Sequence, residues 1–404
     1  MRPAEQASAL DFDPSLPGHP DPYPIFHRLR ATAPVHFSPH MGGWAILRYA
    51  DAAAFLRDQA RFSRAALIEQ MLRKFGPQLI LESQSHELAF SDPPGHTRFK
   101  NLVSRAFTPQ AVAALKPHLE EIVDGLLDRV AERGQMDVIA DFAYPLPSIA
   151  ICEMLGVPQA DAAQMMRWVE GIVASRGVVR TQEMITEGDR ATLGFDDYFN
   201  RQIEDRERHP GGSDLLSAFL TVDYHGERLS RLEILTILST IFAAGHATTT
   251  NLIGNGLLAL LHHPAEMARL REHPELIASA VEEMLRYDAP TQAVSPMVAR
   301  EEVEIGGQRV AAGETVSVLI GACNRDPERF ADPDRFDIAR SDNEHLSFSH
   351  GVHYCLGAGL ARLEGQVAIV RLLQRMPRLR LADDRLEWKE MGRFRGLKAL
   401  PIAF

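Results

Sequence analysis

Helical periodicity is the main pattern of the chain, and it extends from Thr97 to about Tyr287 with breaks at prolines and glycines. Within this region, Ile234–Leu261 is a stretch of 28 residues without Asp, Glu, Lys or Arg. At about 1.5 Å per residue it predicts a helix of about 40 Å, long enough to cross a domain. Its threonines, its asparagines and His246 make it too polar for a lipid-facing helix, so we expect it inside the protein and not in a membrane.

Short extended and irregular segments flank this helical region. Alternating apolar and polar residues predict strands at Trp44–Tyr49 and Thr315–Ile320, and a hairpin at Val303–Val310. Residues 1–25 are rich in proline, and residues 63–95 lack helical periodicity. We therefore expect coil in the first of these segments and an irregular loop in the second. The whole pattern predicts a mainly α fold with small β-sheets.

The composition is that of an ordinary globular protein. Apolar residues are 45% and charged residues 24% of 404, which excludes disordered, collagen-like and disulfide-scaffold classes. The net charge of −11, from 43 Lys and Arg against 54 Asp and Glu, argues against a nucleic-acid partner. Three cysteines and an N-terminus without an apolar signal region predict a cytoplasmic protein. No repeat, linker or nucleotide-binding glycine motif is visible, which predicts a single domain over residues 1–404 without a reductase module.

The sharpest chemical feature is the segment Phe348–Gly359, in which Cys355 directly precedes a predicted helix over 357–375. A cysteine at a helix N-terminus meets unpaired N–H groups and the positive end of the helix dipole, which favour the thiolate. A thiolate is a ligand for iron. Gly351 and Gly357 allow tight turns that bring N–H donors toward the sulfur. The alternative is a buried structural cysteine in a glycine-rich turn.

Four further motifs accompany this loop. Glu283 and Arg286 are spaced i,i+3 on a predicted helix, so their charges face one another. Alone, such a pair is most simply a surface ion pair. Pro333-Asp-Arg-Phe336 follows it, Ala244-Gly-His-Ala-Thr-Thr249 lies midway along the long helix, and Asp92-Pro-Pro-Gly-His-Thr-Arg98 precedes the helical region.

These motifs, with a cysteine loop that fits Phe-x-x-Gly-x-His-x-Cys-x-Gly, resemble those of the cytochrome P450 family. They occur in the family's order over essentially the whole chain, and the likeness is to soluble bacterial members. The resemblance implies the family's fold, with haem b between the long central helix and the helix after the cysteine loop. It implies that Cys355 is the metal ligand, whose electron donation favours O–O cleavage. It also implies that Arg335 completes a buried triad with Glu283 and Arg286.

The same resemblance implies which residues contact the haem. The expected cofactor-binding residues are Cys355, His353, His96, Lys100, Ala244, Gly245, Phe348, Gly351 and Gly357. His353 and His96 would reach the propionates, and Lys100 stands where the family often has an arginine, which keeps the charge without the bidentate fork. Met297 occupies the place of a common propionate-binding arginine. We expect Arg300, three residues on, to point elsewhere, so water or another basic residue would substitute.

The long helix departs from the family in the oxygen-activating segment. The family usually places an acid before an alcohol there, whereas this chain has Ala247 before Thr248, followed by Thr249 as a further catalytic candidate. We expect the Thr248 hydroxyl to bond the Ala244 carbonyl and to open the helix locally, with room for O₂ and water. Protons would then come through water and Thr248 alone, or from an acid elsewhere, or the chemistry differs. His246 is expected on another face.

The resemblance further implies an apolar small-molecule substrate and a separate redox partner. The expected pocket residues are Thr240, Ala243, Ala244, Val294 and Phe394. The implied reaction inserts one oxygen atom from O₂, as hydroxylation or epoxidation, with electrons from a ferredoxin and its ferredoxin reductase. Alanine in place of the acid keeps peroxide-driven, nitric oxide reductase-like and oxidative-coupling chemistry open, and a non-catalytic haem-binding protein is a third interpretation. We expect a monomer that docks the ferredoxin through basic residues on the cysteine side, namely Arg98, Lys100, Arg105 and Arg362.

Overall fold

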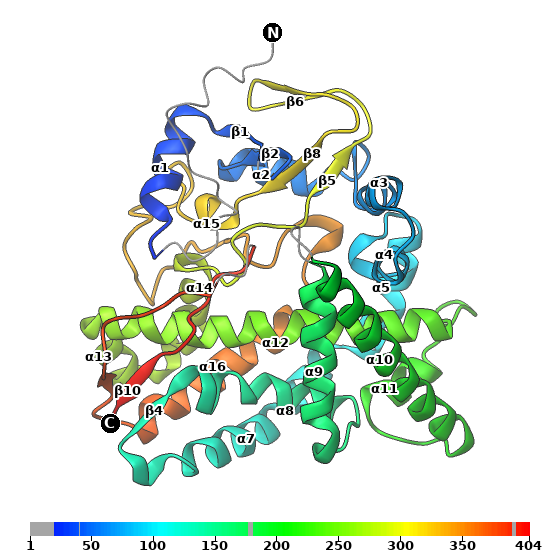
Figure 1. Cartoon of the computed structure of the whole chain (residues 1–404). Helices are drawn as coiled ribbons and strands as arrows, with labels where there is room; N and C mark the ends of the chain where they lie inside the picture. The colour runs from blue at the N-terminus through cyan, green and yellow to red at the C-terminus, as the bar shows by residue number, and fades with distance from the viewer. Residues whose placement is uncertain (1–19, 40, 177–180, 390–392) are drawn as a thin grey trace.

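The computed structural model describes residues 20–39, 41–176, 181–389 and 393–404, and it is mainly helical with small sheets, as the sequence predicts (Figure 1). The helices are α1 (Tyr23–Thr32), α2 (Tyr49–Arg57), α3 (Ala65–Phe75), α4 (Leu79–Ser85), α5 (Gly95–Ala106), α6 (Pro109–Ala114), α7 (Lys116–Asp128), α8 (Pro145–Met154), α9 (Gln159–Ser175), α10 (Gln182–Arg208), α11 (Leu215–Thr221), α12 (Arg231–His262), α13 (Pro264–Glu272), α14 (Ile277–Tyr287), α15 (Ile320–Cys323) and α16 (Ala358–Arg375). The strands are β1 (Val35–Ser38), β2 (Gly43–Ile46), β3 (Phe62–Ser63), β4 (Gln135–Asp137), β5 (Met297–Ala299), β6 (Val303–Ile305), β7 (Gln308–Val310), β8 (Thr315–Val318), β9 (Arg380–Leu381) and β10 (Pro401–Ala403).

The long helix α12 runs through the middle of the molecule. The Oγ atom of Ser230 accepts the amide of Glu233 at 3.2 Å, and Glu233 Oε2 accepts the amide of Ser230 at 2.8 Å. This reciprocal capping box satisfies two otherwise free N–H groups at the helix start. Figure 1 shows α7, α8 and α16 on one side of α12 and the strands β1, β2, β5 and β8 on the other. The helix packs against α8, α9, α14 and α16, so it connects most of the helical layer.

By length and composition α12 could also span a membrane, since its most apolar part has a mean hydropathy of 1.2. Its surroundings are those of a core helix, because helices of the same chain pack against it. The side chains of His246, Asn251 and Asn255 are buried among protein atoms, where a lipid-facing helix would carry apolar groups.

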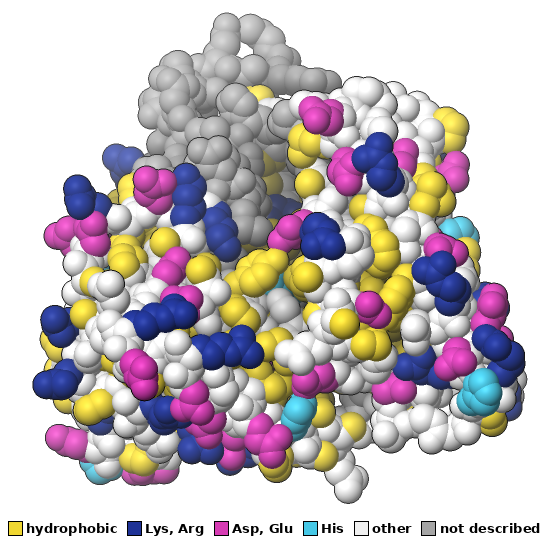
Figure 2. Space-filling view, turned by 60° about the horizontal axis from the view of Figure 1, so that its bottom comes forward, with side chains coloured by type: hydrophobic (Ala, Val, Ile, Leu, Met, Phe, Trp, Pro, Cys, Tyr) yellow, Lys and Arg dark blue, Asp and Glu magenta, His cyan; other side chains and the backbone are white. Residues whose placement is uncertain are grey.

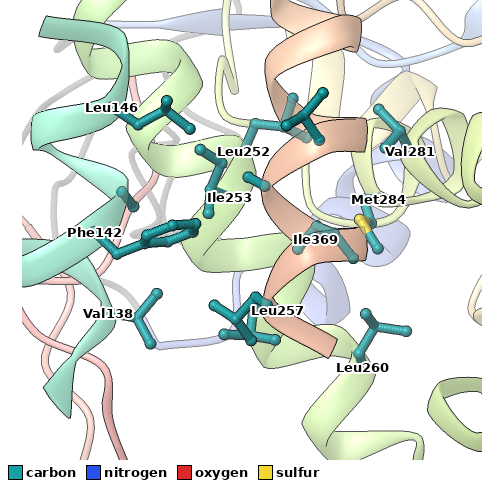
Figure 3. Packing of buried hydrophobic residues seen from close by; sticks show 14 of the residues in the cluster. Val138, Phe142, Leu146, Leu252, Ile253, Leu257, Leu260, Val281, Met284 and Ile369 are labelled. Carbon is teal, nitrogen blue, oxygen red and sulfur yellow. The ribbon is translucent and has the colours of Figure 1, made fainter. Parts of the chain in front are cut away.

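A large hydrophobic core holds α16 against α12. Figure 3 shows Ile253 and Leu257 of α12 between Phe142, which precedes α8, and Ile369 of α16, with Met284 of α14 beside them. Each such side chain contributes about 1.5–3 kcal/mol when it is fully buried. The core therefore fixes the start of α16, and with it the cysteine loop, relative to the middle of α12.

Most of the strands lie on the other side of α12, whereas β4 and β10 lie beside α7 and α16 (Figure 1). A five-stranded sheet has the order β1-β2-β8-β5-β3, a three-stranded sheet has the order β4-β10-β9, and β6 and β7 form a hairpin. The hairpin turns at Gly306 and Gly307, whose φ angles are +53° and +78°, and the sequence prediction of this turn is confirmed. Strands β3 and β5 run antiparallel, with Phe62 opposite Ala299 and Ser63 opposite Val298.

Two local predictions are wrong. The segment 63–95, expected to be an irregular loop, contains α3 and α4. Helix α3 buries a single side chain, Ile68, and α4 has only seven residues. Neither helix therefore leaves a readable periodicity in the sequence. Helix α1 begins at Tyr23, inside the segment expected to be coil, and Pro24 stands in its first turn, where its missing N–H is not needed. Residues 1–19 of that segment lie outside the described residues.

The buried charge cluster contains Arg340, so the prediction of Arg335 as its third member is wrong. Glu283 and Arg286 are 0% exposed and form a bidentate pair at 2.8 and 2.9 Å. Arg340 Nε donates to Glu283 Oε2 at 3.1 Å, whereas the side chain of Arg335 is 63% exposed. Neighbouring residues of an extended segment point to opposite sides, and Phe336 takes the buried side. Arg335 contributes its backbone carbonyl, which accepts from Arg286 at 3.1 Å.

Candidate haem and substrate site

The cysteine loop is a tight turn that places Cys355 just before α16. The amide of Cys355 donates to the carbonyl of Phe348 at 2.9 Å, which closes the loop. Gly351 has a φ of +69°, and a Cβ atom there would lie 2.5 Å from the carbonyl oxygen of Leu56. Only glycine fits this conformation and this close approach.

The sulfur of Cys355 differs from the other two thiols of the chain. Cys152 and Cys323 are buried, whereas Cys355 keeps exposed surface. Burial raises the pKa of the Cys355 thiol, while the amides of Gly357 and Ala358 donate to the sulfur and lower that pKa. The helix N-terminus thus supplies N–H donors as the sequence predicts, although burial outweighs their effect. A group that is desolvated and still has free surface faces a space inside the fold.

Two histidines and an arginine direct unpaired nitrogen atoms into one region. The rings of His96 and His353 are 4.4 Å apart, and His96 Nδ1, His353 Nε2 and Arg64 Nε are buried without a hydrogen-bond partner. Burial lowers the pKa of His96 to about 4 and the pKa of His353 well below its usual range, and the charge of Arg64 lowers both further. At neutral pH this region therefore holds neutral imidazoles beside a guanidinium, a setting that favours an anionic acceptor.

Sequence reasoning missed Arg64, whose place in the sheet explains its position. Met297 on β5 is fully buried. Ser63 lies opposite Val298, the neighbour of Met297, and Arg64 follows Ser63 as the first residue beyond the strand, where α3 begins. Arg300 forms an ion pair with Asp92 at 2.9 Å, so the prediction that Arg300 points elsewhere is confirmed. Only the strand pairing, which the sequence does not show, brings Arg64 to this place.

The middle of α12 places a threonine but no acid at the expected segment. Thr248 Oγ1 donates to the Ala244 carbonyl at 2.6 Å, as predicted, while the α-helix continues without a break. Ala244 is exposed although the residues on either side of it are half-buried. His246 lies on another face, as expected, where its ring nitrogen is 3.2 Å from the Tyr144 carbonyl. The Thr249 hydroxyl bonds the buried carboxyl of Glu364 on α16.

Two of the expected cofactor-binding residues contact other parts of the chain. A Cβ atom on Gly245 would lie 2.9 Å from Ile151 Cδ1, so Gly245 allows α12 to approach α8 and does not line the site. One residue rotates a helix by about 100°, which separates Gly245 from Ala244. The ammonium of Lys100 donates to the carbonyls of Val352 and Tyr354 at 2.5 and 3.1 Å. Lys100 therefore supports the cysteine loop, and its charge also acts on His96 and His353, so its expected contact with a propionate stays a prediction.

The expected substrate residues come from two segments. Phe394 pairs with Thr291, and the amide of Gln292 donates to the Arg393 carbonyl at 2.8 Å, which places Phe394 beside the chain that leads to Val294. Thr240 and Ala243 are half-buried on α12. The sequence analysis missed Arg393, because the C-terminal segment has no periodicity that distinguishes inward from outward positions.

The comparison with protein-family models decides the identity of this fold. The model of the family described as "Cytochrome P450" matches residues 46–385. This chain belongs to the cytochrome P450 family. Its fold, its cysteine-ligated haem and its class as an oxygenase follow from that membership.

Relatives and solved structures cover nearly the whole chain. The "Biotin biosynthesis cytochrome P450" of Bacillus subtilis is 40% identical over 95% of this chain and 96% of its own length. The "Cytochrome P450 monooxygenase PikC" of Streptomyces venezuelae is 41% identical over 95% of this chain and 91% of its own length. The crystal structure of CalO2 superposes with a TM-score of 0.91 at 38% identity, and it covers 98% of this chain and 99% of that one.

The residues present fit the haem that the family carries. Haem propionates are carboxylates, and carboxylates accept hydrogen bonds. The unpaired nitrogens of His96, His353 and Arg64 are donors that such carboxylates would satisfy. The amides that point at the Cys355 sulfur favour an anionic thiolate. The described residues thus include complementary groups both for an iron ligand and for the propionates.

The basic residues expected to dock a redox partner are largely engaged within the protein. Arg98 pairs with Glu233 at 2.6 Å, and Arg362 pairs with Glu282 at 2.6 Å. Arg105 lies over the ring of Tyr224. On the face shown in Figure 2, Lys and Arg side chains alternate with Asp and Glu and do not gather by sign. A strong basic patch at these positions is therefore not a feature of the described surface.

Proposed function

We propose that this protein is a haem-thiolate monooxygenase in which Cys355 ligates the iron of haem b. The observation that carries the proposal is the contrast between Cys355 and the other two cysteines. Cys355 keeps free surface inside the fold, and backbone amides donate to its sulfur. His96, His353 and Arg64 hold the propionates. The haem supplies O₂ binding and O–O cleavage, and the chain positions the substrate and passes protons.

The substrate is an apolar organic molecule that receives one oxygen atom from O₂, by hydroxylation or epoxidation. Apolar residues near the site support this, namely the half-buried Ala243 and Phe394 and the buried Val294. The names of relatives and solved structures mention chemically different small molecules. Examples are a "Vitamin D(3) 25-hydroxylase" of Pseudonocardia autotrophica and a myxobacterial cytochrome P450 in complex with myristic acid. These small molecules share an apolar body, and we propose the same property for the substrate of this chain.

In this proposal the protein is a monomer with a single haem domain in the cytoplasm. It receives its electrons from a separate ferredoxin and the reductase of that ferredoxin. These 404 residues contain no nucleotide-binding glycine motif, and a ferredoxin is the electron donor that we propose for them. Arg105 is the candidate basic contact, since Arg98 and Arg362 already pair with carboxylates.

Ala247 favours a second candidate, a haem-thiolate enzyme of different chemistry. Thr248 bonds back to the helix, and Glu364 bonds Thr249, about 100° round α12 from Thr248. No carboxylate from these residues stands at the usual place. A peroxide-driven, nitric oxide reductase-like or oxidative-coupling reaction would need none. Oxygen uptake coupled to product with ferredoxin supports monooxygenation. Turnover with peroxide, or reduction of nitric oxide with NADH as the direct electron donor, supports the second candidate.

The assignment of Cys355 is tested by substitution. Cys355→Ala is expected to lose the thiolate-type spectrum of the reduced carbon monoxide complex, because the iron loses its sulfur ligand. Cys152→Ala is the matched control, since Cys152 is a buried thiol on α8, and it is expected to keep that spectrum. A thiolate spectrum in Cys355→Ala would overturn the assignment.

A further inference from the structure

Arg393 lies among the residues expected to contact the substrate. It precedes Phe394, and its carbonyl accepts the amide of Gln292 at 2.8 Å. Its Nη1 donates to the hydroxyl of Ser295, which follows Val294. The guanidinium therefore lies between the two segments that line the proposed pocket away from α12.

The guanidinium of Arg393 is enclosed but has no acidic partner. Burial lowers its pKa, and the charge of Arg176 lowers that pKa further. The residue nevertheless keeps exposed surface, the same combination that Cys355 shows. Within the described part of the chain its polar contact is the neutral hydroxyl of Ser295, and no carboxylate pairs with it.

The two neighbouring arginines are balanced by other groups. Arg176 Nη2 forms an ion pair with the buried Glu87 at 2.5 Å. Arg64, whose pKa is lowered by burial and by Arg393, turns toward His96 and His353 and so toward the propionates. Among the described residues, Arg393 is then left without a carboxylate partner. Its guanidinium keeps free surface between the two segments, so it can still pair with an anion from outside the chain.

We propose that Arg393, assisted by Ser295, binds a carboxylate of the substrate, and that the enzyme therefore acts on apolar carboxylic acids. The inference rests on the proposed function, because it takes the space beside Arg393 to be the substrate pocket. The planar guanidinium offers a pair of donors that match the two oxygens of a carboxylate. The apolar body of the acid then extends from Arg393 past Val294 and Phe394 toward Ala244 of α12.

The proposal is tested by spectral titration of the ferric holoenzyme at pH 7.5. Matched pairs of a carboxylic acid and the corresponding primary alcohol are used on linear, terpenoid and aromatic scaffolds. On the preferred scaffold the acid is expected to bind about 10- to 100-fold tighter than the alcohol, as a charged hydrogen-bonded pair provides. Arg393→Met is expected to abolish this preference while it changes the affinity for the alcohol by less than about threefold.

Three controls separate the possible outcomes. Arg393→Lys keeps the charge without the fork, so part of the acid preference should remain. Arg300→Met removes a cation that already pairs with Asp92, and the preference should be unchanged. The absence of an acid preference on every scaffold overturns the proposal, as does an Arg393→Met variant that loses haem or weakens acid and alcohol alike. Failure of the proposed function shows earlier, as the lack of a thiolate spectrum before any ligand is added.

Discussion

At the scale of single residues, the basic residue at the proposed propionate site follows β3 and does not lie on β5. Met297 occupies the position on β5 where the sequence resemblance expects a propionate-binding arginine, and it is fully buried. Arg64 follows β3 directly, after Ser63, which pairs with Val298 next to Met297. Its Nε has no partner among the described residues, and its charge acts on both site histidines. We propose that Arg64, which follows the neighbouring strand, supplies the cation for the propionates in place of Met297.

The positions of Arg64 and Met297 predict that a second substitution restores the haem retention that a first one weakens. Arg64→Met is expected to weaken haem retention about tenfold or more, because a propionate loses a charged hydrogen bond. The double variant Arg64→Met, Met297→Arg should regain much of that loss, since the arginine returns on the opposite strand. The measurement is the rate of haem transfer from the ferric protein to an excess of apomyoglobin.

A matched control removes a nearby arginine that faces solvent. Arg300→Met should retain haem as the unchanged protein does, since Arg300 pairs with Asp92 and is half exposed. If Arg64→Met and Arg300→Met lose haem at the same rate, Arg64 has no special role toward the propionates.

At the scale of elements, a buried ion cluster connects α14 to the segment before the cysteine loop. Glu283 accepts from Arg286, from Arg340, from the amide of Asp337 at 2.9 Å and from Asn343 at 3.1 Å. Each oxygen of this buried carboxylate therefore accepts hydrogen bonds, which offset the free-energy cost of burying the charge. The cluster holds the chain that leads to Cys355 against α14.

The cluster predicts a clear difference between two arginines that are close in sequence. Arg340→Met is expected to lower the free energy of unfolding by about 3 kcal/mol, because it removes one partner of a buried charge. Arg335→Met should lower it by less than about 0.5 kcal/mol, since the exposed side chain makes no contact with Glu283. Urea denaturation of the holoprotein measures both. Equal losses in the two variants would contradict the assignment of Arg340.

At the scale of the whole molecule, α12 and α16 meet around a carboxyl that is kept from water. Glu364 on α16 is buried, and its Oε1 has no partner in the described part of the structure. Burial raises the pKa of Glu364 to about 8, and the Thr249 hydroxyl opposes this rise. The carboxyl is therefore protonated in the folded protein at neutral pH. Its enclosure couples the stability of the whole fold to pH.

The sign of this coupling follows from the two pKa values. Between the ordinary pKa near 4.5 and the folded value of about 8, the folded protein holds a proton that the unfolded chain has released. Stability from this group is therefore present at pH 4.5 and is lost as the pH rises toward 8, by up to a few kcal/mol. Glu364→Gln does not titrate, so its stability relative to the unchanged protein should increase from pH 5 to pH 8.

Urea midpoints of both proteins at pH 5, 6.5 and 8 measure this difference. All other titrating groups are common to the two proteins, so their effects cancel in the comparison. A difference that stays constant with pH would show that Glu364 is ionised in the folded state.

The sequence by itself determined the features that depend on local spacing. The length of α12 and the hairpin at Gly306-Gly307 follow from short-range patterns, as do the start of α16 after Cys355 and the pair of Glu283 with Arg286. The motif order also identified the family, because fixed residue types at fixed spacing are hard to reach by chance. The absence of an acid before Thr248 was likewise visible in the sequence alone.

The tertiary structure decided which basic groups face the site. Arg64 comes there through strand pairing, and Arg393 through its bridge to the 291–295 segment. Lys100 bonds the backbone of the cysteine loop, a contact that the sequence did not show. Local spacing cannot give these positions, because strand register and the side to which an extended residue points are fixed by contacts between segments far apart in the chain.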